Sequence, residues 1–251
     1  MKNLIAGNWK MNPETEKEAK ALFLKIKKGI KNIKNAEVVL CPPFLYLPVL
    51  ANIQPGKIFL GSQNCFWEEK GAFTGEISAL MLKDFKVKYI ILGHSERRKY
   101  FNETNELINK KIKKALDEGL KVIFCAGETA EEKSSGKKLD ALGRQLREGL
   151  KNIPKNKING ISIAYEPVWS IGTGNNCSVE ETMTSVLSIR KIIADLYGRK
   201  SATGMRILYG GSVNSKNAGH YIKESKANGL LAGGASTNAE EFIKIVKSSE
   251  P

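Results

Sequence analysis

Five polar side chains in this sequence are of the types that carry proton-transfer chemistry, and each closely follows a short apolar run. Asn8 and Lys10 follow the first run, His94 and Glu96 follow the fourth, and Glu166 follows the sixth. A carboxylate can act as a general base, and a lysine with a neutral imidazole can stabilise an oxyanion that develops at a carbonyl. The set suits removal of a proton from a carbon beside a carbonyl.

Two glycine-rich turns add candidate anion-binding groups. Gly210, Gly211 and Ser212 follow the seventh apolar run, and a Gly-Gly-Ala-Ser segment at 233–236 follows the eighth. Such turns expose backbone N–H groups, and a helix N-terminus behind them favours negative charge, so they suit a phosphate. Phosphoryl transfer would more naturally need a metal-binding carboxylate cluster, and the sequence shows none.

Each of these residues also has an ordinary structural interpretation when it is taken alone. A single histidine such as His94 is more often structural, Glu166 before Pro167 fits a surface carboxylate at a strand end, and Lys10 is one of 40 lysines and arginines. A Gly-Gly pair is a common turn. Their joint placement after apolar runs favours one shared site.

The apolar runs predict eight β-strands. Most are apolar without strict alternation, which indicates strands covered on both faces, as in a parallel sheet. The runs are 4–7, 38–41, 58–61, 89–92, 122–125, 161–164, 206–209 and 229–232. Helical patterns separate them, and eight alternations in 251 residues favour a single closed (β/α)8 barrel with an outer ring of helices. We expect one catalytic domain over residues 1–251, with its site where the carboxyl ends of the strands meet.

Local signals also predict where several helices begin. Asn12 followed by Pro13 matches an N-cap and a first helical residue. In the segment 44–53, Pro48 allows only a short helix. The pairs that resemble capping boxes are Ser178 with Glu181 and Thr237 with Glu240. The apolar stripes at helical spacing are Ala19, Leu22, Phe23, Ile26 and Ile30, and Leu139, Leu142, Leu146 and Leu150.

Composition narrows the class of protein. The formal net charge is +14. We expect most lysines on solvated helix faces, because apolar residues interrupt the lysine runs at helical spacing. A positive field would also help to capture a phosphorylated substrate. No zinc-ligand spacing, RNA-binding aromatic motif or basic tail indicates nucleic-acid binding.

Cysteine usage and hydropathy indicate a soluble cytoplasmic protein. The chain has four cysteines in no CxxC pair and only two histidines, which argues against a zinc site. Cys41 and Cys125 end apolar runs and are expected to pack as small hydrophobic side chains, and reduced thiols fit the cytoplasm. The first ten residues do not read as a secretory signal. No apolar segment reaches the roughly 18 residues of a membrane span.

Six motifs occur in an order that makes a family resemblance specific. They are Asn-Trp-Lys at 8–10, Gly-His-Ser-Glu-Arg-Arg at 93–98, Ala-Tyr-Glu-Pro-Val-Trp at 164–169, Ile-Gly-Thr-Gly at 171–174, Tyr-Gly-Gly-Ser-Val at 209–213 and Gly-Gly-Ala-Ser at 233–236. Over essentially all 251 residues the chain closely resembles the triosephosphate isomerase family. The resemblance implies an enzyme of glycolysis and gluconeogenesis without a cofactor or metal.

The resemblance also implies roles for the site residues. Glu166 would move a proton from carbon one of dihydroxyacetone phosphate to carbon two, and His94 would polarise the carbonyl, which is the known division of labour in the family. Lys10 would stabilise the enediolate with Asn8 beside it, and Glu96 corresponds to an acidic residue near the lysine. The residues whose backbone would hold the phosphate are Gly172, Ser212, Gly233 and Gly234.

Two further segments resemble functional loops of the family. Residues 167–177 resemble its mobile lid, although Ser170 stands where alanine is usual and Asn-Asn-Cys at 175–177 departs from the usual exit hinge. Residues 63–76 resemble the loop that reaches into a second subunit, with Thr74 expected near Asn8 and Lys10 of the partner subunit. A homodimer is implied; the alternative is an ordinary surface loop. Ala227-Asn228 stands where the family usually has an aspartate, which concerns local packing.

Two other functions remain open at this point. The chain could be another phosphate-binding barrel enzyme, which a metal requirement or turnover of an indole or pentose phosphate would favour. It could also be a catalytically silent basic binding protein, which salt-sensitive RNA binding without isomerase activity would favour.

Overall fold

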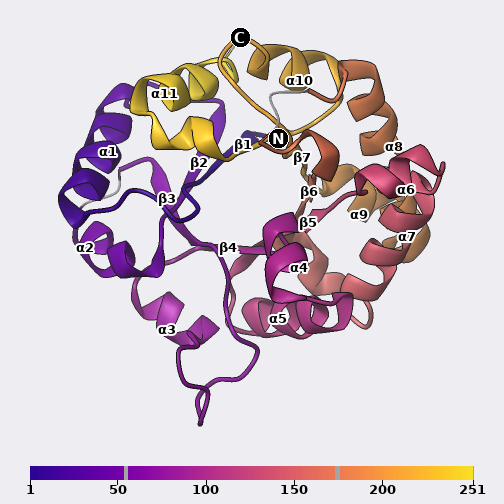
Figure 1. Cartoon of the computed structure of the whole chain (residues 1–251), viewed down its shortest axis with the longest axis horizontal. Helices are drawn as coiled ribbons and strands as arrows, with labels where there is room; N and C mark the ends of the chain where they lie inside the picture. The colour runs from indigo at the N-terminus through magenta and orange to yellow at the C-terminus, as the bar shows by residue number, and fades with distance from the viewer. Residues whose placement is uncertain (54–55, 173–175, 251) are drawn as a thin grey trace.

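Eight parallel strands close into a barrel in which every strand pairs with its neighbours in chain order (Figure 1). The structure is a computed structural model that describes residues 1–53, 56–172 and 176–250. The strands are β1 (Asn3–Asn8), β2 (Ala36–Cys41), β3 (Ile58–Ser62), β4 (Tyr89–Leu92), β5 (Lys121–Ala126), β6 (Ile161–Tyr165), β7 (Ile207–Tyr209) and β8 (Gly229–Ala232). All eight predicted strands are present, so the (β/α)8 fold class is confirmed.

Helices form the outer ring around this barrel (Figure 1). The α-helices are α1 (Glu16–Gly29), α2 (Leu47–Asn52), α3 (Ala79–Asp84), α4 (Ser95–Phe101), α5 (Asn105–Asp117), α6 (Ala130–Ser134), α7 (Lys138–Gly149), α8 (Val179–Tyr197), α9 (Arg199–Gly204), α10 (Ala218–Glu224) and α11 (Ala239–Lys247). The 3-10 turns are η1 (Phe44–Tyr46), η2 (Lys155–Gly160), η3 (Val168–Ser170) and η4 (Gly234–Thr237). In the segment 44–53 the α-helix, α2, is short, as Pro48 predicts.

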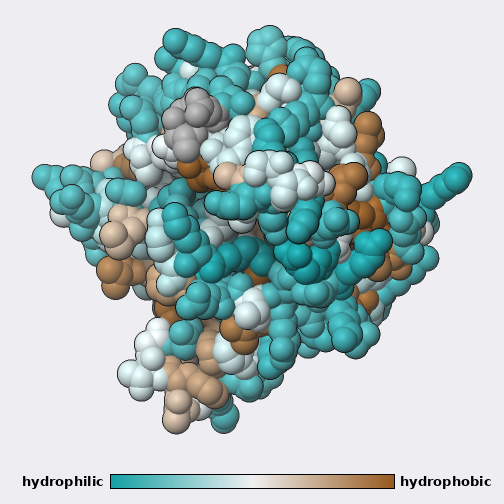
Figure 2. Space-filling view, turned by 45° about the vertical axis from the view of Figure 1, so that its right-hand side comes forward, coloured by the Kyte–Doolittle hydropathy of each residue, from teal (hydrophilic) through white to brown (hydrophobic). Residues whose placement is uncertain are grey.

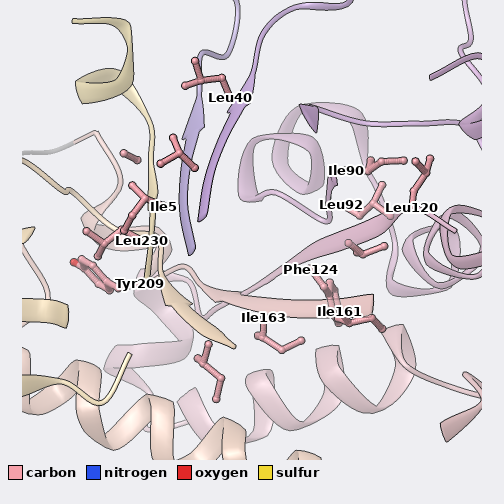
Figure 3. Close-up of a cluster of buried hydrophobic side chains, with 14 of the residues drawn as sticks. Ile5, Leu40, Ile90, Leu92, Leu120, Phe124, Ile161, Ile163, Tyr209 and Leu230 are labelled. Carbon is pink, nitrogen blue, oxygen red and sulfur yellow. The ribbon is translucent and has the colours of Figure 1, made fainter. Parts of the chain in front are cut away.

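The strands bury side chains on both faces, which explains their unbroken apolar character. Ile5 belongs to a large cluster that also contains helix residues such as Phe23, whereas its neighbours Leu4 and Ala6 belong to a second, smaller cluster. Successive strand residues point to opposite faces, so the large cluster lies between strands and helices and the small one fills the barrel interior. Figure 3 shows part of the outer cluster. The predicted burial of Cys41 and Cys125 is confirmed, in the interior cluster.

A polar group closes the amino-terminal end of the barrel interior. Arg206, one residue before β7, donates to Glu37 Oε2 at 2.8 Å and to the Tyr89 hydroxyl at 3.0 Å. The Tyr89 hydroxyl also donates to Glu37. Burial opposes ionisation of Glu37, but the Tyr89 and Arg206 contacts lower its pKa overall. At this end of such a barrel, polar residues support stability rather than catalysis.

Helix α1 begins later than the sequence predicts. The N-cap is Thr15, not Asn12, because Thr15 Oγ1 accepts from the Glu18 amide at 3.2 Å while the Glu18 carboxylate accepts from the Thr15 amide at 3.1 Å. This reciprocal pair satisfies two backbone donors at once. The Asn12 side chain instead donates to the Trp9 carbonyl at 3.3 Å.

The other predicted helix signals have mixed outcomes. Ser178 is the N-cap of α8, as predicted, but Glu181 does not return the bond, since its carboxylate pairs with two lysines. Helix α11 is capped by Asn238 rather than Thr237, and Glu240 pairs with Lys25. The predicted stripes are buried at most of their positions. The exceptions are Leu22, which is partly buried, and Leu139, which has 56% of its surface exposed.

Closure between β8 and β1 depends on a glycine. The Leu4 amide donates to the Asn228 carbonyl at 2.9 Å. The Asn228 side chain accepts from the Ile207 amide at 3.2 Å and from the Arg190 guanidinium at 2.9 Å. Asn228, which stands where the family usually has an aspartate, thus joins β7, β8 and α8. Gly229 has a φ of +145°, and a Cβ there would lie 1.9 Å from the Leu4 carbonyl oxygen. Only glycine permits this close pairing.

We therefore expect Gly229→Ala to destabilise the protein by at least about 3 kcal/mol, because it combines an unfavourable φ with a backbone collision. Thermal and urea unfolding measure the loss. Gly204→Ala is the matched control, since that glycine lies in α9 with nothing within 4 Å of an added Cβ. Equal stability of the two variants would contradict this account of barrel closure.

Candidate functional site

A small cavity lies where the carboxyl ends of the strands meet. Its volume is about 240 Å³, below the roughly 300–1,000 Å³ typical of pockets for drug-sized ligands, so it favours a small molecule. Eight residues predicted from the sequence line it: Asn8, Lys10, His94, Glu166, Gly172, Ser212, Gly233 and Gly234. They come from five separate strand ends and connections of the barrel, those of β1, β4, β6, β7 and β8. Closure of the strands is therefore what brings them together.

Glu166 is a buried carboxylate with one oxygen engaged and one facing the histidine. Only 2% of its surface is exposed. Its Oε2 accepts from the Ser95 amide at 2.9 Å. Its Oε1 has no hydrogen bond within the described residues and lies 3.3 Å from His94 Nε2. A buried oxygen of this kind is costly unless a ligand satisfies it.

His94 owes its position to a left-handed glycine and to the start of α4. Gly93 has a φ of +75°, which turns the chain after β4. His94 then caps α4, with its Nδ1 accepting from the Glu96 amide at 3.3 Å. An N–H aimed at Nδ1 requires a lone pair there, so this arrangement selects the neutral tautomer that carries its proton on Nε2. That Nε2 faces Glu166 and the cavity.

Lys10 is held from several sides. Its φ of +54° is unusual for a residue with a side chain. The Asn8 side-chain Oδ1 accepts from the Lys10 backbone amide at 3.0 Å, and the Gln63 side chain donates to the Lys10 carbonyl at 2.8 Å. The Lys10 ammonium pairs with Glu96. Glu96 does not line the cavity but acts on the lysine that does.

The opposite side of the cavity is built from small residues. A Cβ on Gly233 would lie 3.2 Å from Lys10 Cε, so the lysine stem passes close to the backbone of this turn. Ser212 Oγ donates to the Ser170 carbonyl at 2.6 Å and so ties this side to η3. η4 begins at Gly234. Short side chains beside a helical turn leave backbone groups accessible to an anion.

Sequence reasoning did not single out several residues that support the site. Glu128 is fully buried and accepts from the Tyr165 hydroxyl at 3.0 Å and from Trp169 Nε1 at 2.9 Å. Burial, with the nearby Glu128 carboxylate, raises the pKa of Tyr165, so its hydroxyl remains a donor. Glu128 and Gln63 follow β5 and β3, so asking which polar residues follow each apolar run would have found both. The contact of the Ser95 backbone amide with Glu166 could not be found in this way.

The remaining expectations concern metals, membranes and the lid. Within residues 1–53, 56–172 and 176–250, no group of three or more His, Cys, Asp or Glu side chains is arranged to hold a metal ion. In the same residues no helix is long and apolar enough to cross a membrane. Of the lid segment, residues 173–175 lie outside the described residues, so the Asn-Asn-Cys hinge at 175–177 is described only at Asn176 and Cys177.

Comparison with known proteins gives the same answer from one end of the chain to the other. A family model described as triosephosphate isomerase matches residues 3–249. A triosephosphate isomerase of Caldanaerobacter subterraneus subsp. tengcongensis is 48% identical over 244 residues, which cover 97% of this chain and 98% of that protein. The triosephosphate isomerase of Alkaliphilus oremlandii is 47% identical over 246 residues, which cover 98% of this chain and 98% of that protein. The one of Dictyoglomus thermophilum is 47% identical over 251 residues, which cover 98% of this chain and 99% of that protein. The chain therefore belongs to the triosephosphate isomerase family.

Proposed function

We propose that this protein is an isomerase that interconverts dihydroxyacetone phosphate and D-glyceraldehyde 3-phosphate within one catalytic domain, residues 1–251. The main structural support is the pair formed by Glu166 and His94. A buried carboxylate oxygen with no hydrogen bond within the described residues lies 3.3 Å from an imidazole nitrogen at the edge of a small cavity. A substrate carbon and carbonyl between these groups would meet both a base and a hydrogen-bond donor.

Glu166 acts as the base in the proposed mechanism. Its carboxylate takes a proton from carbon one of the ketose, the electron pair of that C–H bond forms the carbon–carbon double bond of an enediolate, and the carbonyl pair moves onto O2. The hydroxyl proton then moves from O1 to O2, the C1–O1 bond becomes the new carbonyl, and the proton held by Glu166 returns to carbon two to give the aldose. The Ser95 amide holds one carboxylate oxygen at 2.9 Å, which leaves the other for the substrate. Orientation of this kind supplies much of the rate enhancement in proton-transfer enzymes.

His94 and Lys10 stabilise the charge that develops on the substrate oxygens. The Nε2 proton of the neutral imidazole would donate to the oxyanion, and the Lys10 ammonium would lie close by, with Asn8 fixing its backbone. The ion pair with Glu96 positions the lysine. Gly172, Ser212, Gly233 and Gly234 would hold the phosphate on the opposite side.

A homodimer is part of this proposal. Residues 63–76, between β3 and α3, project beyond the ring of helices in Figure 1, and Figure 2 shows apolar surface on the projecting region among largely hydrophilic surroundings. Within the loop, Phe66 stacks on Trp67 at 3.9 Å and packs on Phe73 at 4.7 Å, yet Phe73 remains 42% exposed. Exposed aromatic surface of this kind favours burial in a partner.

The base of the loop is anchored tightly enough to present that surface. Lys111 is buried, unlike most lysines, and donates to the Asn64 side chain at 2.9 Å while it pairs with Glu103. Burial opposes ionisation of Glu103, but Lys111 and Arg97 lower its pKa overall, which favours the carboxylate. A cytoplasmic location also remains part of the proposal, supported by four unpaired thiols.

Replacing Glu166 should abolish most of the activity. We expect Glu166→Gln to lower kcat at least about 10³-fold because the base is lost, and Glu166→Asp to lower it about 10²-fold because the carboxylate is displaced by about 1 Å. A coupled assay with dihydroxyacetone phosphate and glyceraldehyde 3-phosphate measures both. Glu106→Asp on α5 is the control, since its side chain is 78% exposed. Retention of a tenth of kcat by the glutamine variant would exclude Glu166 as the base.

The tautomer of His94 can be read by ¹⁵N NMR. At pH 7 we expect its Nδ1 to be unprotonated and its Nε2 protonated, because the Glu96 amide points at Nδ1. The second histidine, His220, is exposed and lies 2.7 Å from Glu224, so it serves as the internal reference. Protons on both His94 nitrogens at neutral pH would contradict the proposed role as a neutral electrophile.

The oligomeric state tests the loop. We expect sedimentation to give a dimer, and Phe73→Asp to shift the equilibrium towards the monomer because a charge replaces an exposed aromatic side chain. Leu139→Asp is the control, since Leu139 is 56% exposed on α7, outside the loop and away from Asn8 and Lys10 in sequence. A monomeric wild-type protein would leave residues 63–76 as an ordinary surface loop.

A further inference from the structure

One lysine outside the cavity lies unusually close to an aromatic ring beside it. Lys133 Nζ, from α6, is 3.4 Å from the centroid of the Trp169 ring. Other lysine–aromatic contacts in the described part of the chain are longer, such as Lys138 with Tyr165 at 5.4 Å. Tryptophan is the strongest partner for a cation over its ring. Of these contacts, the one between Lys133 and Trp169 is the shortest and involves the ring that binds cations most strongly.

Lys133 is itself fixed by a carboxylate from another helix. Glu181, in the first turn of α8, accepts from Lys133 at 3.0 Å and from Lys138 at 3.2 Å. Burial opposes ionisation of Glu181, but the two lysines lower its pKa overall. Glu181 is in the position from which a glutamate would reciprocate the cap of α8, yet it pairs with lysines of α6 and α7 instead. This arrangement holds the Lys133 ammonium over the indole.

The edge of the same indole is held from the opposite direction. Trp169 Nε1 donates to Glu128 Oε1 at 2.9 Å, and the Val168 amide donates to the Glu128 carbonyl at 3.0 Å. Trp169 is the central residue of η3, which leads directly to Ile171 and Gly172 on the cavity wall. The Trp169 ring is thus held in place just before Ile171 and Gly172, the two residues of this segment that line the cavity.

We propose that Lys133 is a positioning residue for the isomerisation, acting through the Trp169 ring to hold η3 and thereby the Ile171–Gly172 wall of the cavity. The inference rests on the proposed function, because the wall matters only if a phosphorylated substrate occupies the cavity. Lys133 touches no cavity group itself. Its effect reaches the reaction through the turn that it holds in place.

Loosening this wall has two chemical consequences. The substrate loses contacts on one side, which raises KM. The enediolate also becomes more exposed, and it can then break its C3–O bond, with the electron pair leaving on inorganic phosphate. The remaining enol takes up a proton at carbon three, loses its hydroxyl proton and becomes methylglyoxal. Loss of the Lys133 contact should therefore increase both KM and the fraction of turnovers that release inorganic phosphate.

The test compares Lys133→Gln with the wild-type enzyme. We expect KM for glyceraldehyde 3-phosphate to rise about fivefold, kcat to change less than KM, and the yield of methylglyoxal per turnover to increase. Lys133→Arg should restore wild-type values, because a guanidinium can also lie on the ring and pair with Glu181. Lys25→Gln is the control for charge alone, since Lys25 pairs with Glu240 at 3.0 Å on the α1 side of the barrel.

A double-mutant cycle shows whether the ring transmits the effect. In a Trp169→Phe background, Lys133→Gln should change KM and partitioning much less than it does in the wild-type background. An active wild type whose Lys133→Gln variant has unchanged KM and partitioning would overturn the inference, and so would an effect of equal size in the Trp169→Phe background. A wild type without isomerase activity would instead overturn the proposed function.

Discussion

Parallel closure of the barrel is the constraint on which the site depends. All strands run in the same direction, so every carboxyl end lies on the same rim, and residues as distant in sequence as Lys10 and Gly233 are brought into contact. The approach is close, since a Cβ at residue 233 would lie 3.2 Å from Lys10 Cε. The β8–β1 seam is closer still, since a Cβ at Gly229 would lie 1.9 Å from the Leu4 carbonyl oxygen. Glycines therefore allow close packing both where the barrel closes and at its site.

The site combines rigid support with one polar group left unsatisfied. Asn8, Gln63 and Glu96 hold Lys10, while the Ser95 amide and the barrel wall hold Glu166. The second Glu166 oxygen has no hydrogen bond within the described residues. The lack of this hydrogen bond opposes folding by about 1–3 kcal/mol, and a substrate proton beside the oxygen would recover part of that energy. Electrostatic preorganisation of this kind is typical of enzyme sites.

Much of this arrangement could be predicted from sequence, and the reason is physical. A strand covered on both faces is apolar throughout, so the first polar residue after it marks the rim, and Glu166 after β6 and Asn8 at the end of β1 illustrate this rule. Helix starts were less predictable. Asn12 and Thr15 are both residue types that cap helices well, and α1 begins after Thr15 because Thr15 forms the reciprocal pair with Glu18. Asn238 caps α11 because its side chain accepts from the Glu241 amide, whereas the Thr237 hydroxyl donates back to the Gly234 carbonyl. The hydrogen bond from the Ser95 amide to Glu166 links the ends of two strands, and no local sequence pattern indicates it.

The burial of all four thiols gives this chain a useful chemical property. Cys41, Cys65, Cys125 and Cys177 are all buried, and burial raises the pKa of Cys65 to about 12 and that of Cys177 to about 11. A folded molecule therefore offers alkylating reagents neither access nor thiolate. Modification by such a reagent would proceed through transient opening of the barrel, so its rate would report conformational opening without any engineered probe. A cysteine introduced on the surface would, in turn, be the single rapidly labelled position of the native enzyme.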